Sequence, residues 1–150
     1  THHLFGLRAA LDLIMAEGIE AVWARHDTLA RAIWAACEAW GTTGPLELNI
    51  SDPALRSRAV TALRIGAPHG SALRRWVQDN AGVTLGIGLG MAEPGDPAWH
   101  GFFRIGHMGH VNAHMVLGAL GAIEAGLTAL DIPHGTGALA AAARVIAGRG

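Results

Sequence analysis

The stretch Leu46-Glu47-Leu48-Asn49-Ile50 alternates apolar and polar residues with a period of two. This alternation is typical of a strand with one buried face, because successive side chains of a strand point to opposite faces. The residues before it follow a helical period instead, so the chain changes here from helix to strand. The sequence therefore predicts a mixed fold.

Two helices are predicted N-terminal to this strand, because apolar residues recur there every three or four positions. The first ends or bends at Gly18, and the second covers residues 19–40, with Gly41 where a C-cap glycine belongs. Helices this long and apolar are expected to pack on a larger body or in a subunit interface. The two stripes consist of Leu4, Leu7, Leu11, Ile14, Ile19, Val22, His26, Leu29, Ile33, Cys37 and Trp40.

Three further strands are predicted at residues 59–65, 83–89 and 102–106. In the second of these, apolar residues share one face and small residues leave the other nearly bare, so something must approach it closely. Residues 91–101, with two prolines and two glycines, are expected to form a loop. The shared apolar face would consist of Val83, Leu85, Ile87 and Leu89.

Three more helices complete the prediction. Ser71 can cap a helix that ends at Gly82, Asn112 can cap a second, and the Ala-rich residues 136–148 form the last. The order of elements predicts an α+β domain, with a small, mainly antiparallel sheet and helices packed on one side.

The chain is expected to divide into three parts. Residues 1–41 form long helices that link to or pack on a larger domain, residues 42–133 form the small α+β domain, and residues 134–150 add an extra helix. The chain starts at Thr1 rather than methionine, and we expect it to be a fragment of a longer protein.

The composition excludes several classes of protein. Of 150 residues, 51% are hydrophobic and only 15% charged, which argues against disorder. A net charge of −1 gives no basic surface for nucleic acid or an anionic membrane. A single cysteine, Cys37, cannot form an internal disulfide, and neither a signal peptide nor an apolar span is evident, so we expect a cytoplasmic protein.

Arg104 is the most informative candidate, because it lies between large apolar neighbours in the predicted strand 102–106. An arginine is seldom buried unless an anion pairs with it. Glu93 and Asp96, in the preceding loop, could form a structural ion pair. The alternative is that the guanidinium binds a ligand carboxylate through two hydrogen bonds. Spacing alone does not choose between these readings.

Other candidates are weaker. His107, His110 and His114 would share one side of a helix, but Gly109 interrupts it and no carboxylate or cysteine completes a metal shell, so no metal site is predicted. His107 is expected near a pocket or as a structural histidine. The segment 86–90 (Gly-Ile-Gly-Leu-Gly) is half of a dinucleotide fingerprint but no helix follows it, and bare backbone near a pocket wall is the better reading.

The string Phe103-Arg104-Ile105-Gly106-His107-Met108-Gly109, preceded by Gly88-Leu89-Gly90, resembles the C-terminal part of class V pyridoxal-phosphate aminotransferases, in the alanine/serine–glyoxylate (serine–pyruvate) group. Residues 7–11 and 17–26, which hold the Glu-Gly joint and a Trp-x-x-His pattern, resemble the two consecutive helices of that family. The similarity spans residues 1 to about 130, and the tail from Asp131 is similar to that of some bacterial members, including pyridoxamine–pyruvate aminotransferase.

This resemblance implies the C-terminal small domain of a fold-type-I enzyme that works as a homodimer. The parent reaction would move an amino group from alanine or serine to glyoxylate or pyruvate. Arg104 would bind the α-carboxylate of the substrate, and His107, Gly88, Leu89 and Gly90 would line the pocket. The pyridoxal phosphate would be bound mainly by residues outside this chain.

The sequence contains no lysine, so the chain cannot form the family's Schiff base and should be inactive alone. Two other readings stay open at this stage: a free-standing α+β module that binds an amino acid through Arg104, and a pyridoxamine–pyruvate aminotransferase. Desulfuration, another class V chemistry, would need a reactive cysteine on a loop, whereas Cys37 lies on a helix stripe.

Overall fold

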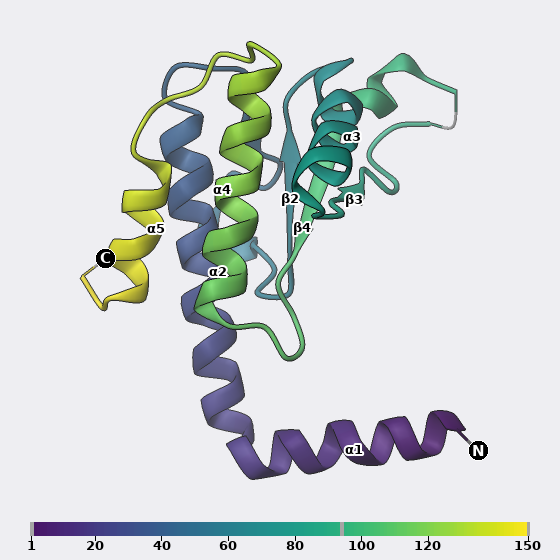
Figure 1. The fold of residues 1–150 in the computed structure, drawn as a ribbon, viewed down its shortest axis with the longest axis vertical. Coiled ribbons are helices and arrows are strands. Elements are labelled where there is room, and N and C mark those ends of the chain that lie inside the picture. The colour runs from purple at the N-terminus through teal and green to yellow at the C-terminus, as the bar shows by residue number, and fades with distance from the viewer. Residues whose placement is uncertain (1, 94, 150) are drawn as a thin grey trace.

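The computed structural model describes residues 2–93 and 95–149. A bundle made of α2, α4 and α5 lies beside a small sheet, α3 lies at the other end of the sheet, and α1 runs away from this body (Figure 1). The helices are α1 (His2–Glu17), α2 (Ile19–Trp40), α3 (His69–Ala81), α4 (Ala113–Ala129) and α5 (Ala138–Ile146).

The sheet has four strands in the order β1-β2-β4-β3, and every pairing is antiparallel. The central pair, β2 and β4, is joined over five residue pairs, from Val60 opposite Gly106 to Arg64 opposite Phe102. The α+β prediction is therefore confirmed. The strands are β1 (Glu47–Leu48), β2 (Val60–Arg64), β3 (Gly86–Ile87) and β4 (Phe102–Gly106).

The core lies on one face of the sheet. Leu63 and Phe103 are completely buried, and they belong to one cluster with side chains from α2, α3, α4 and α5. The opposite face carries the residues that alternate with them, among which Ala62 and Arg104 are only half-buried. Because a strand sends successive side chains to opposite faces, the helices cover one face and leave the other open.

The core takes residues from all three predicted parts of the chain. The second half of α2 supplies Ile33 and Trp40, and α5 supplies Ala138 and Ala142. Within this cluster, α2 and α5 pack directly on each other.

Glycines mark both ends of α2, for different reasons. Gly18 has φ +87°, a conformation that glycine adopts without steric cost, and this lets the chain turn between α1 and α2. Gly41 is not left-handed (φ −70°), but a Cβ there would lie 2.6 Å from the carbonyl oxygen of Leu46. The predicted helix end is right, and close backbone approach explains the glycine.

Three local predictions are wrong in detail. Strands predicted at 46–50 and 83–89 each form only two ladder residues, and Ile87 and Leu89 are exposed instead of joining Leu85 in the core. Ile87 is exposed because β3 is the edge strand, although it pairs with the buried Phe103, and the chain leaves the ladder before Leu89. Ser71 does not cap α3, which begins two residues earlier, and its hydroxyl pairs with His100 at 2.8 Å.

Among the described residues, no helix has the length and apolar character needed to cross a membrane.

Candidate functional site

Arg104 lies on the open face of the sheet, in the middle of β4. Its neighbours across the ladder are Ala62 on β2 and Gly86 on β3, two of the smallest residues available. Its Nε donates a hydrogen bond to the carbonyl oxygen of Ile87 at 2.6 Å. Because the flanking residues are small, the guanidinium is accessible from the open face and held at its Nε edge.

The structural ion pair considered for Arg104 does not form among the described residues. Six arginines there form salt bridges with carboxylates, and Arg104 is not one of them. Asp96, one of the two proposed partners, instead accepts a hydrogen bond from the backbone N–H of Ala98 at 2.8 Å and caps a short 3-10 helix. The cation therefore retains its capacity to bind an acid.

The bare face of the glycine segment lies close against β4. A Cβ at Gly86 would lie 3.2 Å from the Cβ of Arg104, and one at Gly88 would lie 2.4 Å from the Cβ of Phe102. These glycines let β3 lie close against β4. Leu89 and Gly90 continue beyond the strand and line a separate groove with Phe102.

His107 is completely buried, at the point where β4 ends. Its Nε2 lies 2.9 Å from the hydroxyl oxygen of Thr61, which accepts a hydrogen bond from the indole N–H of Trp34 at 3.0 Å. The other ring nitrogen, Nδ1, is buried without a hydrogen-bond partner among the described residues. Burial lowers the pKa of His107, so the neutral form is favoured. His107 thus lies in the interior of the protein.

The three histidines considered for a metal do not share a helix. His107 follows β4, His110 lies in the next loop, and His114 lies in the first turn of α4. No group of three metal-binding side chains comes together anywhere in residues 2–93 and 95–149.

Cys37 is buried on α2, and burial raises the pKa of its thiol. A thiol held in the protonated form is a poor nucleophile. This environment fits packing, as predicted, and gives no support to a desulfuration reaction.

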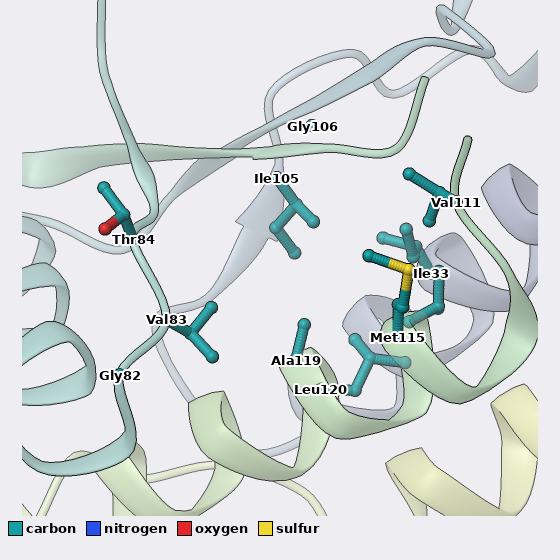
Figure 2. Close-up of a pocket in the computed structure, with 11 residues that line it drawn as sticks. Ile33, Gly82, Val83, Thr84, Ile105, Gly106, Val111, Met115, Ala119 and Leu120 are labelled. Atoms are coloured by element: carbon teal, nitrogen blue, oxygen red, sulfur yellow. The ribbon is translucent and has the colours of Figure 1, made fainter. Parts of the chain in front are cut away.

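Two cavities lie beside the central strands. The first, of about 350 Å³, lies between α2, α4 and the end of β4; its wall is apolar apart from Thr84, and Ile105, Val111 and Met115 point into it (Figure 2). The second, of about 250 Å³, is lined by β2 and the chain before it, together with Trp34 of α2. Its lining includes Ala62, the ladder neighbour of Arg104, but also Thr61 of the covered face, and it includes no residue of β4.

A second set of polar contacts joins α2 to the loop after β4 and to α1, and the sequence pattern does not predict it. Arg25 and His26 of α2 bind the backbone of the loop after β4, and Arg25 also binds Glu17 of α1. The resemblance pattern contains these residues, but spacing in the sequence does not reveal that they meet a loop more than 80 positions away.

The residues of this chain fit a carboxylate better than they fit a cofactor. Pyridoxal phosphate needs a lysine for its covalent link, and the sequence contains none. Arg104, by contrast, has the planar fork of donors that matches a carboxylate. The chain can therefore supply an anchor for an acid but not the covalent cofactor link.

No family model matches the chain. It is 39% identical to a serine–glyoxylate aminotransferase of Arabidopsis thaliana, over 93% of this chain and 33% of the relative. A pyridoxamine–pyruvate aminotransferase from Mesorhizobium loti superposes with a TM-score of 0.82 at 32% identity, over 97% of this chain and 35% of that one. A ureidoglycine–glyoxylate aminotransferase from Bacillus subtilis gives a TM-score of 0.80 at 28% identity, over 96% and 35%.

The similarity to class V aminotransferases expected from the sequence is thereby confirmed. The chain spans about a third of the length of these relatives.

Proposed function

We propose that this chain is the carboxylate-binding part of a pyridoxal-phosphate-dependent aminotransferase, which moves an amino group from serine or alanine to glyoxylate or pyruvate. The observation that carries the proposal is Arg104, a cation without an acidic partner in the described residues, on the open face of the sheet. The substrates of such a reaction are amino and keto acids, and both carry a carboxylate next to the reacting carbon.

The hydrogen bond made by Arg104 fixes the direction from which a carboxylate can bind. Nε is already engaged with the carbonyl oxygen of Ile87. The acid must therefore approach the edge formed by the two terminal nitrogens, where two parallel N–H···O bonds can form. A substrate held at two points keeps its reacting carbon in one orientation, which lowers the barrier to reaction.

The cofactor, when bound, supplies an electron sink for the carbanion chemistry of the amino acid. Residues outside this chain would hold it and form the link to its aldehyde, because the chain has no lysine. Arg104 would bind and orient the acid on the open face of the sheet.

The remaining parts of the proposal concern assembly and location. Residues 1–41 would link to the rest of the enzyme, which works as a homodimer. Support comes from α1, whose leucines and Phe5 are exposed although apolar. The lone Cys37 is buried and unpaired, which agrees with a cytoplasmic location.

The test is Arg104→Lys in the full-length protein. Lysine keeps the charge but loses the two-pronged geometry, so affinity for the amino acid should fall by about 1.5 to 3 kcal/mol. Kinetics with serine, alanine and glyoxylate, together with absorbance in the cofactor band, provide the measurement. Unchanged kinetics would refute the role of Arg104. An absent cofactor with retained amino-acid binding would favour a free-standing binding module.

A pyridoxamine–pyruvate activity is the second candidate, favoured by the TM-score of 0.82 to such an enzyme. Pyridoxamine has no carboxylate, whereas pyruvate has one. In that case the Arg104→Lys change should raise KM for pyruvate and leave KM for pyridoxamine unchanged. The same kinetic series with the two donors therefore separates the candidates.

A further inference from the structure

We propose that Arg25 is a positioning residue for the reaction. It joins α1 to the loop that follows β4, and it thereby sets the position of Arg104, which would bind the substrate carboxylate, relative to the rest of the protein. The inference rests on the proposed function, because it assumes that Arg104 binds the substrate. It assigns a role to a part of the resemblance pattern that the site leaves unused, the segment from Glu17 to His26.

Arg25 uses its whole guanidinium group. Nε and Nη2 donate to the two carboxylate oxygens of Glu17, at 2.6 and 2.7 Å. Nη1 donates to the carbonyl oxygens of Gly109 and Val111, at 3.1 and 2.7 Å. One side chain therefore joins the last residue of α1 to both ends of a short loop segment, which a lysine ammonium cannot do because it lacks the planar fork.

His26 adds a second contact to the same loop. Its Nε2 lies 3.0 Å from the carbonyl oxygen of Gly109, and since a carbonyl only accepts, Nε2 carries the proton. Gly109 has φ +83°, as Gly18 has φ +87°, so each end of the connection sits beside a turn that favours glycine. The two turns bring α1, α2 and the loop together, and the hydrogen bonds of Arg25 hold them in place.

The direction of α1 depends on these hydrogen bonds of Arg25, because few other contacts hold the helix against the body of the molecule. None of its residues, His2 to Glu17, is buried, and it runs away from the body of the molecule (Figure 1). The side chains of Arg25 and Glu17 are 25% and 31% exposed, so their pair is partly shielded from solvent. Arg25 also holds the pKa of Glu17 below its ordinary value.

The connection matters for the reaction because the substrate has two ends. Its carboxylate would be bound by Arg104, whereas its amino group must be bound outside this chain, which lacks lysine. The distance between the two anchors depends on how this chain seats on the remainder, and α1 is the apolar arm available for that seating. An error of about 1 Å in such positioning costs on the order of a hundredfold in rate.

The experiment uses Arg25→Gln in the full-length enzyme, with glyoxylate as acceptor and two donors: L-serine, and ethanolamine, which is the same amine without the carboxylate. We expect kcat/KM for serine to fall on the order of tenfold to a hundredfold and the value for ethanolamine to change little. Arg31→Gln is the matched control, because Arg31 lies on the same helix in an exposed pair with Asp27. It should leave the serine-to-ethanolamine ratio unchanged.

Hydrogen exchange provides the readout that is independent of activity: the amides of residues 107–112 should exchange faster in the Arg25→Gln protein, while those of β2 and β4 should not. If Arg25→Gln does not fold, Arg25→Lys should give a smaller change in the same direction. An equal loss for both donors, or an unchanged ratio, would overturn the inference. Arg104→Gln separates the two ideas, because a ratio that survives this change refutes the proposed function itself.

Discussion

The two faces of strand β4 differ in what they contribute. Phe103 and Ile105 point into the core, where they are 0% and 5% exposed, and the helices cover them. Phe102 and Arg104 alternate with them along the same strand and lie on the open face. A single five-residue strand therefore carries both a large part of the packing and the one cation proposed to bind substrate.

Stability and substrate binding are therefore separable in this strand. Side chains on the covered face gain their free energy from burial, which requires a close fit. Arg104 contributes little to packing, because its neighbours Ala62 and Gly86 are small and its side chain hydrogen-bonds to a backbone oxygen, that of Ile87. Substitutions on the two faces should therefore have different signatures.

The largest expected effect is on the covered face. Phe103→Ala removes a completely buried ring at the centre of the sheet and should lower the free energy of unfolding by about 3 to 5 kcal/mol. Phe102→Ala, one residue earlier on the open face, should cost about 1 kcal/mol because that ring is only partly buried. Denaturant unfolding of both variants checks this, and equal losses would break the distinction between the faces.

A second prediction concerns the polar chain inside the covered face. Thr61→Val keeps the volume but leaves the indole N–H of Trp34 and Nε2 of His107 without their partner. Leaving buried polar groups unpaired should cost about 1 to 3 kcal/mol. Thr128→Val is the control, since that hydroxyl is exposed on α4. The measurement is again unfolding by denaturant, and a loss no larger than that of the control would show that the network adds no stability.

The third prediction is a pH dependence due to His107. Burial lowers its pKa in the folded state below the ordinary histidine value of about 6.5, so at a pH near that value the unfolded chain binds more protons than the folded chain does. The stabilisation is present above pH 6.5 and is lost as the pH falls below it, with a slope of at most about 1.4 kcal/mol per pH unit.

Unfolding free energies measured between pH 7.5 and 5 should show this slope. His107→Gln should flatten it. The carboxyl groups of Glu17 and Asp27, whose pKa values are lowered, titrate below this window. A slope that persists in His107→Gln would assign it to another group.

The smallest effect is expected at the edge of the open face. Glu47 of β1 forms an ion pair with Arg64 of β2, and both side chains are more than half exposed. Glu47→Gln should change the free energy of unfolding by less than about 1 kcal/mol, and added salt should reduce the difference further. A larger, salt-independent loss would show that the open face is more shielded than its exposure indicates.

Local patterns predicted much of this fold. The spacing of apolar residues set the limits of α1 and α2 almost to the residue, and it also located β4 and the Asn112 cap of α4, whose side chain accepts from the backbone N–H of Met115. These features depend on contacts within a few positions of the chain. The candidate arginine was found in the same way, from its position in an apolar strand.

Local patterns do not predict which distant segments these elements pack or pair with. An alternating segment at 83–89 predicts a strand, but only two of its residues find a place beside β4. The sequence leaves open whether His107 lies near a pocket or is a structural histidine, because the Trp34 and Thr61 side chains beside it in the interior are far away in the sequence. Sequence spacing contains no information about such distant contacts.

The amino-acid pattern is enough to identify an α+β chain without lysine, with Arg104 in an apolar strand and a motif that resembles class V aminotransferases. The contacts between distant segments add that Arg104 lies on the uncovered face, that no described carboxylate pairs with it, and that Arg25 joins α1 to the loop after β4. Periodicity specifies which side chains share a face, because it follows from local backbone geometry, whereas the surroundings of that face depend on packing between segments far apart in the chain.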